Sequence, residues 1–196
     1  MRIVITFLLV VLSLNSVAQT TTEKNWVDSE MNDTDRFGNT FSITHSLPKG
    51  GAIYTDNTGK IYSYVIFWYC ITNTAEVPLE LAIQFPAENY SIFDSKDSHI
   101  RIVLPSETMT SEKITQFDYG LTNLKDFLDT ELGEPNRLKK IIYPNEEYFF
   151  YSSVLVHQAS GSARAAFLVE DQKLFYQIKI GSDFSSIPCG SITFKE

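Results

Sequence analysis

The chain has 196 residues, of which 43% are hydrophobic, 13% aromatic and 20% charged, and its formal net charge is −8 at pH 7. This length suits one domain with a substantial hydrophobic core. The acidic balance repels phosphate backbones and anionic membrane surfaces, and no run of Lys and Arg in the sequence offsets it, so we expect no nucleic-acid partner.

Residues 1–18 have the pattern of a secretory signal peptide. Arg2 is a short basic n-region, residues 3–14 are almost entirely apolar, and Ser16 and Ala18 are the small residues that a signal peptidase reads. We expect cleavage between Ala18 and Gln19 and secretion to the periplasm or the extracellular space. No later apolar run approaches membrane-spanning length, so we expect no integral membrane segment after signal removal.

Residues 19–35 are polar, and we expect a partly disordered lead-in to a single domain over residues 36–196. Apolar and polar residues then alternate with period 2, most regularly over residues 79–85, which indicates half-buried strands. Residues 61–71 are apolar on both phases, which predicts a strand that is covered on both faces or one that lies centrally with aromatic side chains reaching over its neighbours. The predicted strands are 41–47, 53–54, 60–72, 79–85, 90–93, 100–104, 138–143, 148–157, 163–169, 174–180 and 191–195.

One helix is predicted at about residues 122–132. Five apolar residues fall on one helical face and must dock on the sheet: Leu121, Leu124, Phe127, Leu128 and Leu132. Thr122 is the expected N-cap, and Gly133 followed by Pro135 is a stop signal.

These elements predict an all-β fold, an antiparallel β-sandwich with one short docked α-helix. The segment 62–85 resembles the middle hairpins of immunoglobulin-like folds, which implies an immunoglobulin-like architecture. The chain departs from that family because Trp68 and Cys70 share one strand, whereas immunoglobulin domains place the Trp and the bridging Cys on different strands.

No catalytic or metal motif is assembled in the sequence, and we expect no cofactor. The three histidines His45, His99 and His157 have no ligand partner at metal-site spacing, and we interpret them as structural or surface residues. An acidic run, Asp28, Glu30, Asp33 and Asp35, suits either a solvated surface or a weak Ca²⁺ site; we favour the former because no EF-hand pattern is complete.

Cys70 and Cys189 are the two cysteines of the chain. Export to an oxidising compartment favours a disulfide between them. The alternative is that both are small buried apolar side chains.

An aromatic stretch, Tyr148, Phe149, Phe150 and Tyr151, offers a ligand-binding surface on a strand. Because the residues alternate between the two faces of the sheet, half of them at most are available once the core is packed. We expect a secreted, non-enzymatic binding module for a protein or a glycan. The alternative is a small secreted hydrolase whose site assembles only in three dimensions.

Overall fold

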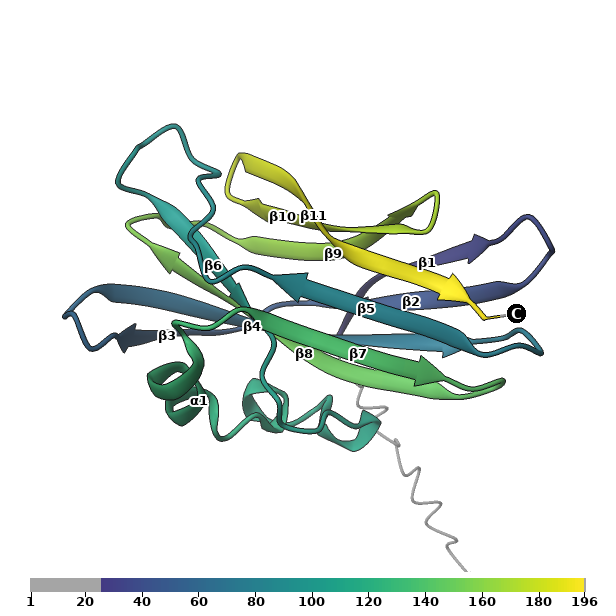
Figure 1. Ribbon diagram of the computed structural model, residues 1–196. Coiled ribbons are helices and arrows are strands. Elements are labelled where there is room, and N and C mark those ends of the chain that lie inside the picture. Colours follow the sequence, from purple (N-terminus) through teal and green to yellow (C-terminus); the bar gives the residue numbers. More distant parts are fainter. Residues whose placement is uncertain (1–25, 196) are drawn as a thin grey trace, which may run out of the picture.

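The computed structural model describes residues 26–195. Within them, two antiparallel sheets pack face to face and one α-helix lies outside the sandwich (Figure 1). This confirms the predicted all-β sandwich with a docked helix. The proposed signal peptide, the Ala18–Gln19 cleavage site and the start of the lead-in lie outside the described residues.

The first sheet is built around one long central strand, β4, and has the order β1-β2-β4-β8-β6. Strands β2 and β3 follow one another along the same edge of β4, pairing with residues 69–73 and 61–66 respectively. Its strands are β1 (Val27–Thr34), β2 (Thr40–Ser46), β3 (Lys49–Thr55), β4 (Ile61–Asn73), β6 (His99–Val103) and β8 (Glu147–His157).

The second sheet has the order β7-β5-β11-β10-β9. Its strands are β5 (Leu79–Phe85), β7 (Asn136–Ile142), β9 (Ala163–Glu170), β10 (Lys173–Ile180) and β11 (Asp183–Phe194). A bulge interrupts β11 near Gly190, where a Cβ atom would lie 1.9 Å from the carbonyl oxygen of Ala82. Only glycine allows β11 to approach β5 this closely.

The main core lies between the sheets. Leu79, Leu81, Ile83 and Phe85 all point into it and are at most 2% exposed, as the period-2 pattern of β5 requires. Their polar neighbour Gln84 faces solvent. The prediction for this strand is therefore confirmed over its whole length.

A cover segment, residues 104–135, crosses the outer face of the first sheet (Figure 1). It contains two 3₁₀ helices, Ser111–Lys113 and Phe117–Gly120, and the helix α1 (Leu124–Glu131). Leu121, Leu124, Leu128 and Leu132 are buried against Trp68, Leu155 and other residues of that face. Strand β4 is thus apolar on both phases because one face meets the core and the other meets the cover segment.

The cover segment is attached to the sheet through Tyr119. Asp118, Tyr119 and Gly120 have φ angles of 46°, 56° and 67°, a left-handed turn that directs the Tyr119 side chain to the junction of β2 and β3. Its hydroxyl donates to the carbonyl oxygen of Leu47 (2.6 Å), and the hydroxyl of Tyr151 donates to the Tyr119 carbonyl oxygen (2.7 Å). These hydrogen bonds offset the unfavourable conformational free energy of two non-glycine residues with positive φ angles.

Several boundaries differ from the prediction. The predicted lead-in is wrong for residues 27–34, which form the edge strand β1. Residues 90–93 do not form a strand and contribute only an isolated bridge between Tyr90 and Ile100. Strand β11 begins at Asp183 rather than at residue 191. Asn123, and not Thr122, is the N-cap of α1, without a capping bond from its own side chain.

The immunoglobulin-like likeness is not confirmed. In immunoglobulin domains the conserved Trp packs on the inter-sheet disulfide. Here Trp68 and Cys70 point away from the inter-sheet core and lie under the cover segment.

Candidate functional site

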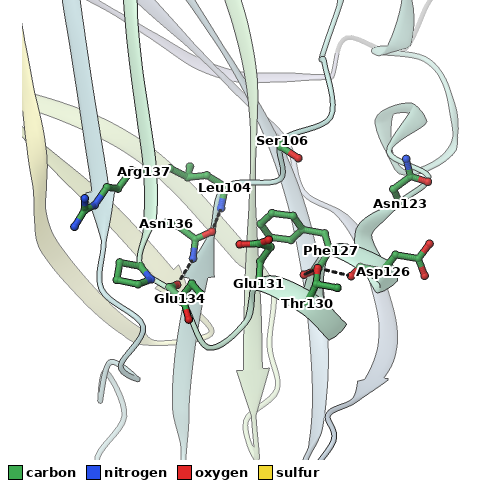
Figure 2. A pocket seen from close by; sticks show the side chains of 11 residues that line it. Leu104, Ser106, Asn123, Asp126, Phe127, Thr130, Glu131, Glu134, Asn136 and Arg137 are labelled. Carbon is green, nitrogen blue, oxygen red and sulfur yellow. Dashed lines mark hydrogen bonds between the residues drawn. The ribbon is translucent and has the colours of Figure 1, made fainter.

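A cleft of about 750 Å³ lies between α1, the end of β6 and the start of β7 (Figure 2). The helix contributes Asp126, Phe127, Thr130 and Glu131, while Leu104 and Ser106 follow β6. The turn into β7 supplies Glu134, Pro135, Asn136 and Arg137. A volume of this size is typical of small-ligand sites.

Asn136 joins two walls of this cleft. Its side-chain oxygen accepts a hydrogen bond from the backbone N–H of Leu104 (3.2 Å), and its side-chain nitrogen donates to the carbonyl oxygen of Glu134 (3.2 Å) (Figure 2). The residue is 9% exposed. The start of β7 is therefore held in a fixed position against the end of β6.

Glu107 positions the helical wall. One oxygen of its carboxylate accepts hydrogen bonds from the backbone N–H groups of Thr122 (3.0 Å) and Asn123 (3.3 Å), and the other lies 2.9 Å from the Lys113 ammonium. Glu107 thus binds the amide of the N-cap residue Asn123, one of the amides that have no partner within the helix, and the amide of Thr122 before it. Burial alone would raise the pKa of Glu107, but these hydrogen bonds outweigh it and lower the pKa.

Apart from Asn136, most polar side chains of the cleft are exposed to solvent. Asp126, Glu131 and Glu134 carry carboxylates, and Asn123 carries an amide; all four side chains belong to exposed residues. The ring of Phe127 is half-buried between them. A carboxyl group that acts as a general acid is usually buried or coupled to a second charge, and these carboxylates are not desolvated.

A second group of ionisable side chains lies where β6 pairs with β8. His99 and His157 are cross-strand partners with ring centroids 4.8 Å apart, and Tyr62 packs on both rings. Burial, followed by the charges of Lys60, His157 and Arg101, lowers the pKa of His99. His99 is 8% exposed, so a substrate has little access to its imidazole.

His45 is also a structural residue. It is 2% exposed, its Nδ1 atom lies 3.2 Å from the hydroxyl of Ser29, and burial lowers its pKa to about 4. The two buried histidines therefore agree with a structural interpretation, and His157 is half-buried at the end of its strand.

The aromatic stretch of β8 is largely used in packing. Phe150 belongs to the inter-sheet core and Tyr151 to the cluster under the cover segment. Tyr148 stacks on Phe150, and Phe149 packs on Trp68, so both are half-buried. Two of the four residues singled out from the sequence are thus enclosed, and the other two have one covered side.

The acidic run of β1 does not converge on a metal site. Asp28 pairs with Arg164 at 3.1 Å, and the Asp35 carboxylate accepts hydrogen bonds from the backbone N–H groups of Phe37 and Asn39. Between residues 26 and 195, no group of three or more His, Cys, Asp or Glu side chains is arranged to hold a metal ion.

The expected disulfide is not formed in this structure, because both thiols are free and lie in different hydrophobic clusters. Cys189 is in the inter-sheet core, and Cys70 is under the cover segment on the opposite face of the first sheet. Burial raises the pKa of Cys70 to about 11 and that of Cys189 to about 12, so neither is a reactive thiolate. The alternative of two buried apolar side chains describes this arrangement.

Fold and cleft together define an antiparallel β-sandwich with an open, polar, acidic cleft at one edge. Comparisons of the chain with protein-family models, curated proteins and solved structures find no match. In the part of the chain that the structure describes, no helix is both long and apolar enough to cross a membrane.

The sequence did not point to this cleft. Its lining residues come from three segments, and Asn136 and Glu131 carry no motif of their own. The sequence offered only indirect evidence for the cleft. It predicts a docked helix followed directly by a strand, and such an arrangement brings polar residues of both elements close together.

Proposed function

We propose that the protein is a secreted, non-enzymatic binding module whose cleft between α1 and β7 binds a glycan. The observation that carries this proposal is the composition of the cleft: a half-buried aromatic ring surrounded by exposed carboxylates and an amide, with no His or Cys.

The chemistry of these groups suits hydroxyl-rich ligands. Carboxylate oxygens can accept hydrogen bonds from sugar hydroxyls, and the amide of Asn123 can both donate and accept. The Phe127 ring offers an apolar surface for the C–H face of a pyranose ring. Because acidic residues outnumber Arg137 in the cleft, a neutral sugar chain fits better than an anionic one.

The competing function is hydrolysis by a pair of the cleft carboxylates. Glycosidases need two carboxyl groups at a fixed separation on opposite sides of the scissile bond, with the pKa of one raised. Asp126, Glu131 and Glu134 come from one short segment and are all exposed, which favours binding.

The test is a neutral-glycan array with the purified protein, followed by calorimetry on the oligosaccharides that bind. Phe127→Ala should abolish binding and Asp126→Asn should weaken it, while Lys96→Gln, far from the cleft in an exposed loop, should leave it unchanged. Binding that survives Phe127→Ala, or no binding by any neutral glycan, would refute the proposal. Release of reducing sugar that Glu131→Gln or Glu134→Gln abolishes would instead establish the hydrolase.

Export is a separate part of the proposal. Intact-mass analysis of the protein recovered from the periplasm or medium should give a chain that begins at Gln19. A secreted form that retains residues 1–18 would contradict it.

A further inference from the structure

The outer face of the second sheet differs from that of the first, because no described helix covers it (Figure 1). Its strands alternate between core residues and outward residues. On β10, Leu174, Tyr176 and Ile178 are buried, while Lys173 and Lys179 are exposed. This sheet therefore presents a flat, solvated surface five strands wide.

Six basic side chains of the described residues lie on or beside the strands of this surface. We call it the basic face and define it by six residues: Arg137, Lys139, Arg164, Lys173, Lys179 and Lys195. The acidic residues among the outward side chains of the same strands are Glu80 and Glu170. An acidic protein thus carries one face on which positive charge is in excess.

Four of these cations are available to a ligand. Arg164 pairs with Asp28 at 3.1 Å and Lys195 pairs with Glu80 at 2.9 Å. Arg137, Lys139, Lys173 and Lys179 form no ion pair with another residue of the described chain, and all four are exposed.

The pairing of the strands fixes the spacing of the charges. Lys139, Ala82, Ser191 and Lys173 are successive partners in one row across β7, β5, β11 and β10. Three strand spacings separate the two lysines by about 14 Å, and the six residues from Lys173 to Lys179 span about 20 Å along β10. The cations therefore surround an area wide enough for several sugar rings.

The centre of the basic face is mixed, with polar and apolar side chains side by side. Gln177 lies between Ser186 and Ala166, and the half-buried Phe175 lies between Pro188 and Leu168. Phe184, the cross-strand partner of Lys179, is 57% exposed on the same face. Two aromatic rings beside an amide and a hydroxyl suit a sugar chain, because the C–H face of a sugar ring packs on an aromatic ring and its hydroxyls bond to polar groups.

We propose that the basic face binds an acidic polysaccharide that carries carboxylate groups. The positive charge of the four cations complements carboxylates, and the rings and polar groups of the centre complement sugar rings and their hydroxyls. Nucleic acid fits less well, because duplex DNA carries one charge per about 1.7 Å of helix axis and the protein as a whole has a charge of −8. Arg137 also lines the cleft beside α1, whereas Lys139, Lys173 and Lys179 do not, so the lysine variants below test this surface independently of the cleft.

Calorimetry with polygalacturonate at low ionic strength tests the proposal. Binding should weaken steadily as NaCl is added. The double variant Lys173→Gln/Lys179→Gln should weaken it about fivefold, as expected for two exposed ion pairs. The matched control Lys96→Gln/Lys125→Gln removes the same charge from exposed sites elsewhere and should change the affinity by less than about twofold. Lys139→Gln provides an independent single variant on another strand.

Three further ligands separate the possible partners. Fully methyl-esterified polygalacturonate is neutral and should not bind. Poly-L-glutamate and a DNA oligonucleotide should bind more weakly than polygalacturonate. The proposal is overturned if polygalacturonate does not bind, if the ester binds equally well, or if the control variant loses as much affinity as the lysine variant. Tighter binding of poly-L-glutamate or DNA through the same lysines would replace the polysaccharide by an acidic protein or a nucleic acid.

Discussion

Replacing Glu107 by Ala should destabilise the cover segment and, with it, the cleft. The carboxylate accepts two backbone N–H groups at the start of α1 and pairs with the half-buried Lys113. Loss of a helix cap costs about 1–2 kcal/mol, and the ion pair adds up to about 1 kcal/mol. We therefore expect Glu107→Ala to lower the free energy of unfolding by about 2 kcal/mol, measured by urea denaturation.

The pH dependence gives this prediction a second test. The pKa of Glu107 is lowered in the folded protein, so its contribution is complete above the ordinary value of 4.5 and is lost as the pH falls through the folded pKa. The difference between wild type and Glu107→Gln should shrink accordingly in acid. Glu112→Ala, at an exposed position in the same segment, is the control and should stay within about 0.5 kcal/mol. A loss at Glu107 no larger than at Glu112, or one that persists unchanged at low pH, would refute the capping role.

Three other predictions follow from burial. Leu81→Ala should cost about 2–5 kcal/mol because Leu81 is 0% exposed, and Gln84→Ala should stay within about 0.5 kcal/mol; equal losses in denaturation would mean that the face of β5 is misassigned. His45 binds its proton less readily when folded, since burial lowers its pKa from 6.5 to about 4. Stability should therefore fall by about 3 kcal/mol between pH 6.5 and pH 4, and His45→Gln should flatten the upper part of that slope; an identical slope in the variant would exclude His45 as its source. Cys70 and Cys189 should react with an alkylating reagent once the protein is unfolded, without any reducing agent, and should not react in the folded protein. If mass spectrometry of the unfolded, unreduced protein shows no alkylated thiol, the disulfide is established.

The sequence predicts most of the strands because burial imposes a period of two on their side chains. Strand β5 is the clearest case, with polar residues only on the outward phase. The edge strand β1 cannot be predicted in this way because few of its side chains are buried. Strand β1 is stabilised by its pairing with β2, and this pairing depends on backbone hydrogen bonds rather than on the identity of the side chains.

The start of the helix shows a different limit. Local rules assign the N-cap to the nearest suitable side chain, Thr122. In the structure the N-cap residue is Asn123, and its amide is bound by Glu107, about fifteen residues earlier, after the chain has folded back. No pattern of neighbouring residues encodes a cap that forms only through tertiary contact, and the same applies to the cleft that this cap helps to shape.

The distribution of charge shows why net charge alone is a poor guide to partners. Averaged over the chain, the acidic balance disfavours any polyanion. Ionic screening, however, limits a bound ligand to the charges within about 10 Å at 0.1 M salt.

Lys139 and Lys173 are separated in sequence by a turn, two strands and two loops, yet strand pairing places them in one row. A ligand on the second sheet therefore meets local positive charge, whereas one in the cleft meets Asp126, Glu131 and Glu134. Two surfaces of opposite sign on one small sandwich can select ligands of different charge.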